Sequence, residues 1–211
     1  MTTAIIGTGG IGSAIARQLA SGGEALQLSS ADKKSARKLA AAVGGAASVA
    51  DDNRTALRGA DAVVLALRFP VLKDVLDEIA DALSETFLVV PSNPVGLDAK
   101  GEIVRLLPEG ESSGEAVAGW LPAGTPFAIA FGTMAADLFE SSSHRSPERA
   151  VLFYVSEDDR GRNKVEHLIR TAGFEPLRIG GIEQSSRLEV GGDLHDLVVG
   201  STEARSLVVG A

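Results

Sequence analysis

Two hydrophobic patterns alternate along the chain. Short apolar runs, typical of buried strands, are followed by segments in which apolar residues recur every three or four positions, as in amphipathic helices. Strands are expected at 3–7, 25–30, 46–49, 61–68, 86–90, 126–131, 150–156 and 174–180. Helices are expected at 11–21, 33–43, 53–59, 71–84, 112–121 and 160–172, and the tail 185–211 is expected to be largely helical.

This alternation predicts a parallel sheet with helices on both faces, because right-handed crossovers place each helix against the sheet. The run DAVVLALR at 61–68 is apolar throughout most of its length, which suits a central strand buried on both faces. We therefore expect a doubly wound α/β fold of the Rossmann type. Residues 1–140 would form the dinucleotide-binding domain and 141–211 a small C-terminal α/β domain packed on it. The polar stretch 141–149 is expected to be a surface connection.

Composition excludes several classes of protein. The chain has 211 residues, 45% of them hydrophobic, and no cysteine, so it can form neither a disulfide framework nor a thiolate zinc site. Its formal net charge of −8 argues against binding to nucleic acid or to anionic membranes. No apolar run approaches the roughly 20 residues of a membrane span. The lack of cysteine fits a cytoplasmic protein. The three histidines are scattered along the chain, so no metal site is expected. A homodimer is left open.

The first strand is followed by a glycine motif, Gly7-x-Gly9-x-x-Gly12, which opens the first helix. Each glycine has a physical role in binding a dinucleotide: Gly7 permits the tight turn, Gly9 lets the backbone approach the pyrophosphate, and Gly12 lets helix and strand pack closely. The helix N-terminus then offers free N–H groups to the phosphates. The spacing alone is a weak signal, and its place between a strand and a helix makes it informative.

The end of the second strand bears on which dinucleotide binds. Ser29 and Ser30 end this strand, and Lys33 and Lys34 follow it. Hydroxyl and ammonium groups suit the 2′-phosphate of NADP, so we favour NADP(H) over NAD(H). Asp32 leaves two interpretations open: it could accept from the ribose of NAD, or it could cap the following helix.

The chain resembles the NADP oxidoreductases that depend on the deazaflavin coenzyme F420. The fold of that family is also found in the reductase domain of STEAP-type ferric reductases. The motifs that carry the resemblance lie in the expected order: GTGGIG (7–12), SS (29–30), LALRFPVLKDVL (65–76), VVPSNPVG (89–96), IAFGTMAADLF (129–139) and AGFEPLRIGGIEQSSRLE (172–189).

The resemblance implies hydride transfer from ring to ring between NADP(H) and a deazaflavin or flavin, a small-molecule redox acceptor. Such transfer requires positioning rather than a protein acid or base, so no catalytic residue is assigned. The pyrophosphate and 2′-phosphate would contact Gly7, Thr8, Gly9, Gly10, Ile11, Gly12, Ser29, Ser30, Lys33 and Lys34. The rest of the dinucleotide and the second ring would contact Leu67, Arg68, Phe69, Ser92, Asn93, Pro94, Val95, Gly96, Phe131, Gly132 and Thr133.

Two positions depart from the family's pattern. Ala31 stands where the family often has an arginine, and Gly132 stands where it often has Asn or His. Because Gly132 has no side chain, we expect a wider acceptor slot with looser specificity.

Three other functions remain open. A reductase of the same fold could act on a free flavin or a ferric complex. A β-hydroxyacid dehydrogenase or pyrroline-carboxylate reductase would need a large helical C-terminal domain, and the residues after 150 look too few and too strand-rich. A non-catalytic NADP(H) sensor would share the fold without the chemistry.

Overall fold

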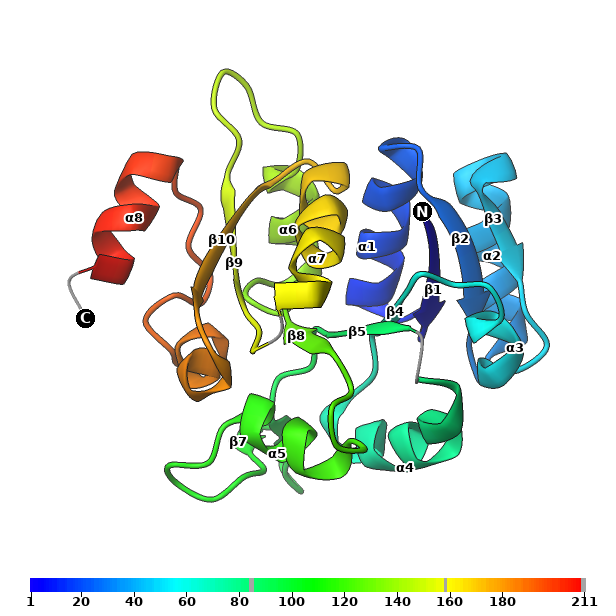
Figure 1. Cartoon of the computed structure of the whole chain (residues 1–211), viewed down its shortest axis with the longest axis horizontal. Helices are drawn as coiled ribbons and strands as arrows, with labels where there is room; N and C mark the ends of the chain where they lie inside the picture. The colour runs from blue at the N-terminus through cyan, green and yellow to red at the C-terminus, as the bar shows by residue number, and fades with distance from the viewer. Residues whose placement is uncertain (84–85, 158, 210–211) are drawn as a thin grey trace.

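A computed structural model describes residues 1–83, 86–157 and 159–209. Its main feature is an eight-stranded sheet with the strand order β10-β9-β8-β5-β4-β1-β2-β3, flanked by helices on both faces (Figure 1). The strands of this sheet are β1 (Thr2–Ile6), β2 (Ala25–Ser29), β3 (Ala47–Val49), β4 (Ala62–Leu65), β5 (Phe87–Val90), β8 (Phe127–Ile129), β9 (Val151–Val155) and β10 (Glu175–Gly180). The α-helices are α1 (Gly10–Ser21), α2 (Lys33–Val43), α3 (Asn53–Leu57), α4 (Phe69–Ile79), α5 (Ser113–Trp120), α6 (Ala136–Ser142), α7 (Asp159–Thr171) and α8 (Ser201–Val209).

The central strands contribute to two separate cores, one on each face of the sheet. In β4, Val63 and Leu65 pack in one core, whereas Val64 packs in the other. Helices α3, α4 and α5 cover the first face, and helices α1, α2, α6 and α7 cover the second. This two-sided burial explains why the strands read as continuous apolar runs rather than as an alternation of polar and apolar residues.

The strand order reverses at β1. The chain goes from β1 outward to β2 and β3, then returns to β4 on the other side of β1. In an open α/β sheet, ligands bind at such a reversal, beyond the carboxyl ends of the strands. The fold therefore places the turn after β1 beside the segment that follows β4.

The expectation of a fully parallel sheet is wrong at one edge. Strands β3, β2, β1, β4, β5 and β8 are parallel, as expected, but β9 pairs with β8 in the antiparallel sense, through Ile129 and Val155 alone. Strand β10 is parallel to β9. An apolar run such as 151–155 shows that a strand is buried and says nothing of its direction. Because β9 and β10 extend the same sheet, the division into domains near residue 140 stays a prediction.

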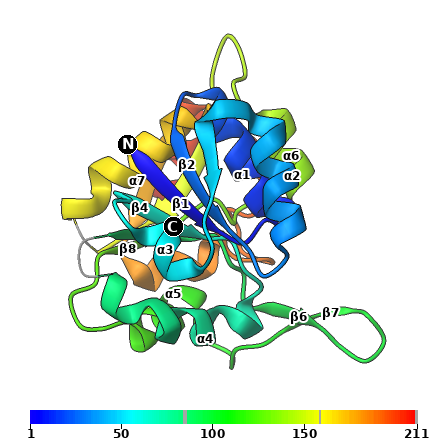
Figure 2. The ribbon, with the colours of Figure 1, turned by 90° about the vertical axis from the view of Figure 1, so that its right-hand side faces the viewer.

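Some elements differ from the expected ones. Strands β6 (Val95–Leu97) and β7 (Ile103–Arg105) form an antiparallel hairpin that was not expected and that projects from the body of the molecule (Figure 2). Helix α6 was not expected either, and its end lies in the predicted surface connection. In the tail, the 3₁₀ helix η3 (Ile182–Leu188) and α8 are separated by a non-helical segment, so the tail is less helical than expected. The expected helix 71–84 ends earlier, with α4 followed by the 3₁₀ helix η2 (Ala80–Ala82), and residues 84, 210 and 211 lie outside the described residues.

Candidate functional site

The glycine turn after β1 has the geometry that a phosphate site requires. Gly7 has φ 100°, and a Cβ there would collide with the Ala66 carbonyl, so only glycine fits. A Cβ at Gly12 would collide with the Gly7 carbonyl oxygen, so this glycine lets α1 pack closely on the turn. A Cβ at Gly9 would meet nothing within 4 Å and would project into open space. Gly9 is thus free of steric constraint from the protein itself, as expected where a ligand approaches.

The N-terminus of α1 faces this open space. Gly9 is its N-cap and has no side chain to cap it, and the first turn holds no acidic residue. The first N–H groups of a helix have no partner within the helix. Gly9 and Gly10 are exposed, and Thr8 is largely buried with its hydroxyl 3.1 Å from the Ser35 hydroxyl. The turn therefore presents backbone donors and a partial positive charge to an anion.

At the end of β2, two of the residues predicted to contact the 2′-phosphate are bonded within the protein, and two are accessible. Ser29 is buried, and its hydroxyl donates to the Asn53 side chain over 2.7 Å, so it faces away from a ligand. Lys33 donates to the Ala50 carbonyl oxygen over 3.3 Å. Ser30 is partly exposed and Lys34 is exposed, so these two remain accessible. Among the predicted contacts at this strand end, Ser30 and Lys34 are the better candidates.

Asp32 caps helix α2. Its carboxylate accepts from the backbone N–H groups of Lys34 at 3.0 Å and Ser35 at 3.3 Å. Of the two interpretations left open by the sequence, the structure supports the capping role. Both N–H groups donate to the same carboxylate oxygen, Oδ1.

A cleft of about 250 Å³ opens beside the glycine turn and collects most of the predicted ring-binding residues. Its lining comes from the start of α1 and from the segments that follow β4, β5 and β8. The predicted members are Ile11, Leu67, Arg68, Phe69, Ser92, Asn93, Val95 and Gly132. The lining also includes Pro91, Met134, Ala135 and Ala136. The last three were missed because they lead into α6, a helix that was not expected.

Arg68 is the ionisable residue of this cleft. It is exposed at the N-cap position of α4, and within residues 1–83, 86–157 and 159–209 no carboxylate forms an ion pair with it. The neighbouring Phe69 is buried, with its ring centroid 5.4 Å from that of Trp120, so Phe69 forms part of the floor of the cleft. The guanidinium is therefore available to a ligand.

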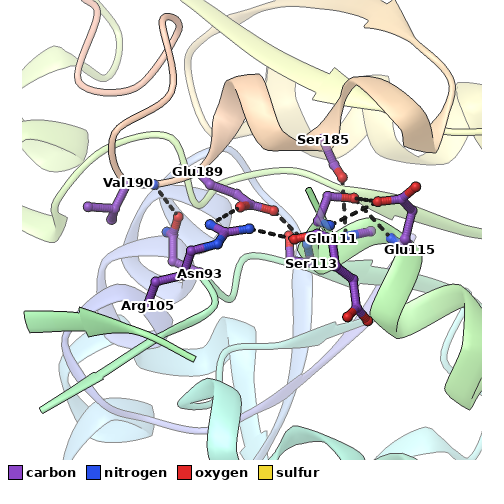
Figure 3. Close-up of polar contacts among 10 residues, drawn as sticks. Asn93, Arg105, Glu111, Ser113, Glu115, Ser185, Glu189 and Val190 are labelled. Atoms are coloured by element: carbon purple, nitrogen blue, oxygen red, sulfur yellow. Dashed lines mark hydrogen bonds and ion pairs between the residues drawn. The ribbon is translucent and has the colours of Figure 1, made fainter. Parts of the chain in front are cut away.

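Ser92 and Asn93 hold the strand ends together. The Ser92 hydroxyl donates to the Leu67 carbonyl oxygen over 2.7 Å and thus joins the ends of β5 and β4. The Asn93 side chain donates to the Gly132 carbonyl oxygen over 2.8 Å. It also accepts from the Val190 N–H over 2.8 Å (Figure 3). Val190 was not predicted, since no local signal relates it to Asn93, 97 residues earlier. Pro94 and Gly96 lead from Asn93 into the hairpin, where the Leu106 side chain lies against Gly96.

The predicted contacts at 131–133 are only partly suited to a ligand. The Phe131 side chain is fully buried and packs on Phe139, so its assignment as a ring contact is corrected: its side chain belongs to the core. A Cβ at Gly132 would collide with the Pro91 carbonyl, so Gly132 permits close approach of two backbones rather than a wider slot. Thr133 is buried, and its hydroxyl has no hydrogen-bond partner among the described residues.

Among the described residues, no helix is long and apolar enough to cross a membrane. No group of three or more His, Asp or Glu side chains in the same residues could hold a metal ion.

Residues 2–94 match the family model described as "NADP oxidoreductase coenzyme F420-dependent", which confirms the resemblance over that part of the chain and supports an NADP-dependent oxidoreductase. These residues include the glycine turn and the strand ends through Pro94. A search of curated proteins found no match.

Solved structures confirm the fold. A hypothetical protein from Sinorhizobium meliloti is 24% identical, with a TM-score of 0.82 over 95% of this chain and 96% of that one. A proposed F420-dependent NADP reductase from Arthrobacter sp. FB24 is 20% identical, with a TM-score of 0.73 over 86% of each chain. Pyrroline carboxylate reductase from Plasmodium falciparum, solved with NADP bound, is 14% identical, with a TM-score of 0.58 over 84% of this chain and 56% of that one.

Proposed function

We propose that this protein is an NADP(H)-dependent oxidoreductase that transfers a hydride between the nicotinamide and a flat ring acceptor of the deazaflavin or flavin class. The observation that carries the proposal is the cleft beside the glycine turn, whose described lining holds one ionisable side chain, Arg68. A reaction that needs an acid or base would require a titratable group there, whereas ring-to-ring transfer requires positioning and exclusion of water.

The residues fit a dinucleotide. The open space at Gly9 and the free donors of α1 would hold the pyrophosphate, with Ser30 and Lys34 near the 2′-phosphate. When bound, NADPH supplies a hydride from C4 of its nicotinamide and becomes NADP⁺, while the acceptor gains two electrons and takes its proton from solvent.

The protein's own residues would shape the space for the two rings. Ile11, Leu67 and Met134 provide apolar walls, and Phe69 closes the floor. Asn93 fixes the ends of β5 and β8 relative to each other, which sets the width of the cleft. The reacting carbons must approach within about 3–3.5 Å, so a rigid cleft of constant width favours the reaction.

The test is an assay of NADPH oxidation with a panel of acceptors: the deazaflavin coenzyme F420, FMN, FAD and a ferric chelate. We expect turnover with the deazaflavin to exceed turnover with FMN, and NADPH to be used in preference to NADH. Turnover with FMN alone would instead favour a flavin reductase of the same fold. Tight NADPH binding without turnover of any acceptor would contradict the enzymatic proposal and favour a sensor.

A further inference from the structure

A second, much smaller cavity adjoins the cleft. Its volume is about 10 Å³, and it shares four wall residues with the cleft: Pro91, Ser92, Asn93 and Gly132. The other wall residues come from β8 and the segment after it, the start of α5 and the end of η3, namely Ile129, Ala130, Thr133, Ser113, Leu188 and Glu189. We call this cavity the polar chamber. Its size admits a group no larger than a single water molecule, so a ring must stay in the cleft.

Two hydroxyl groups in the wall of the polar chamber are unengaged. The side chains of Ser113 and Thr133 are 0% and 2% exposed, and neither Oγ of Ser113 nor Oγ1 of Thr133 has a hydrogen-bond partner among the described residues. Buried hydroxyls are nearly always paired, so two unpaired ones in one small cavity require an explanation. A ligand atom that accepts from both would provide it.

The charge in the chamber restricts that atom. The Glu189 carboxylate is 2% exposed; it accepts from the Ser113 N–H at 2.5 Å and forms an ion pair with Arg105 at 2.9 Å (Figure 3). Both carboxylate oxygens are thus engaged, and Arg105 offsets the negative charge of Glu189, so the chamber holds no uncompensated charge that would attract an ion. A neutral oxygen is the better ligand.

The remaining polar side chains of the wall are already satisfied. Asn93 uses its nitrogen for the Gly132 carbonyl and its oxygen for the Val190 N–H. The Ser92 hydroxyl donates to Leu67. Within the described residues, Ser113 and Thr133 are therefore the side chains of the polar chamber that can donate to a ligand.

We propose that the polar chamber binds one neutral carbonyl oxygen of the acceptor ring through the hydroxyls of Ser113 and Thr133. This inference rests on the proposed function. Deazaflavins and flavins both carry a carbonyl that is conjugated with the atom that accepts the hydride, and its oxygen gains negative charge as the ring is reduced. Hydroxyl donors fixed at that oxygen stabilise the developing charge. The chamber would thereby select the ring's orientation as well as its chemistry.

The test uses Ser113→Ala, Thr133→Val and the double variant, with Thr133→Ser as the variant that keeps the hydroxyl. Binding of F420 and of FMN is measured by fluorescence quenching in the presence of NADP⁺, together with the infrared carbonyl bands of the bound acceptor, KM and kcat. We expect each single variant to raise the acceptor Kd about three- to tenfold, because one neutral hydrogen bond is lost. The acceptor carbonyl band should move to higher frequency, while NADPH Kd stays unchanged. Thr133→Ser should restore wild-type values.

Stability provides a check on these variants. Because the two hydroxyls have no partner among the described residues, their removal should not lower Tm. Ser141→Ala, which alters an exposed hydroxyl bound to the Leu138 carbonyl, is the control. Wild-type acceptor Kd and carbonyl bands in the double variant would overturn this inference, and turnover by the wild type would then leave the proposed function standing. A crystal structure with acceptor bound and a water still in the chamber would also overturn it. Failure of the wild type to reduce any ring acceptor would overturn both.

Discussion

The Asn93 side chain donates to the Gly132 carbonyl oxygen over 2.8 Å and joins the ends of β5 and β8. Gly132 lies so close to Pro91 that a Cβ would collide with the Pro91 carbonyl. A substitution at 132 would therefore disturb two strand ends before it could alter an acceptor. For this reason Asn93, rather than Gly132, is the position at which to test the geometry of the cleft.

Asn93→Asp should lower the free energy of unfolding by about 1–3 kcal/mol, because a carboxylate cannot donate to the Gly132 carbonyl. It should also lower kcat with the acceptor, since the strand ends are no longer fixed. Urea unfolding and steady-state kinetics measure the two effects. Asn163→Asp, at an exposed position of α7, is the control for the added charge. A stable Asn93→Asp protein with normal kcat would show that this bond does not set the cleft's width.

Substitution of Gly9 should weaken NADPH binding, whereas substitution of Gly12 should lower the stability of the fold. Gly9→Ala places a methyl group in open space, so Tm should change little while the NADPH Kd rises at least tenfold. Gly12→Ala forces a methyl group against the Gly7 carbonyl and should cost about 1–3 kcal/mol of stability. Calorimetry and fluorescence titration with NADPH measure both. Gly119→Ala, in α5 with open space around it, is the control: it should leave the NADPH Kd unchanged and should not lower Tm. If Gly9→Ala binds NADPH normally, the pyrophosphate lies elsewhere.

Ser30 and Lys34 should determine the preference for NADPH over NADH. A charge-assisted hydrogen bond to phosphate contributes about 1.5–3 kcal/mol, so Lys34→Ala should raise the NADPH Kd by about tenfold or more and leave the NADH Kd nearly unchanged. Ser30→Ala should act in the same direction with a smaller effect. Ser29→Ala is the matched control, since its hydroxyl is bound to Asn53 and should affect stability only. Equal Kd values for the two cofactors in the wild type would argue that no group here binds the 2′-phosphate.

Arg68 should contribute to ligand affinity without contributing to stability. Because its guanidinium is exposed and forms no ion pair with the described residues, Arg68→Met should leave Tm unchanged and raise the NADPH or acceptor Kd several-fold. The effect should shrink at high salt, since an exposed charge is screened. Titrations at low and high ionic strength measure this. Arg54→Met, which breaks the surface ion pair with Asp81, is the control. An effect of Arg68→Met on Tm alone would assign it a structural role.

The capping box of α5 should make stability depend on pH. The Ser112 backbone N–H donates to Glu115, and this hydrogen bond lowers the pKa of the Glu115 carboxyl from 4.5. Because the folded pKa lies below the unfolded one, the stabilisation is present above pH 4.5 and is lost as pH falls through the folded pKa. Glu115→Gln should therefore be less stable than the wild type at pH 7, with a difference that narrows below pH 4.5. Urea unfolding at several pH values measures it. A difference that stays constant with pH would contradict this assignment. Ser112→Ala should cost about 1 kcal/mol at pH 7.

Local patterns were sufficient for much of the fold. The range predicted for α2 agrees with the structure at both ends, since the Asp32 cap and the glycine after Val43 mark them. The glycine turn and the strand ends were also predictable, because each follows an apolar run directly. These features depend on neighbours in the sequence.

Features that depend on distant residues were not predictable. The β6–β7 hairpin leaves Leu97 and Ile103 72% and 67% exposed, so it lacks the buried face from which a strand is recognised. Phe131 adopts φ 68°, which turns its ring into the core instead of the cleft. The contacts of Asn93 with Val190 and of Ser113 with Glu189 join residues 97 and 76 positions apart.

Strands β8 and β9 meet at an antiparallel junction within the sheet, which we call the seam. One residue pair, Ile129 with Val155, forms the ladder there, so this ladder is shorter than those of the neighbouring strands. The Ser156 hydroxyl adds a bond to the Phe127 carbonyl oxygen over 2.7 Å. The segment after η3 crosses this seam, with Val190 bonded to Asn93 and Asp196 to the Thr133 carbonyl. Local opening should begin along such a line, and amide hydrogen exchange would detect it as faster exchange in β9 than in β1. Asn93 and Thr133 lie on the β5 and β8 side of the seam, and a ligand that rigidifies them would slow amide exchange in β9 on the other side. Occupancy of the cleft would then be observed in the C-terminal strands without any assay of catalysis.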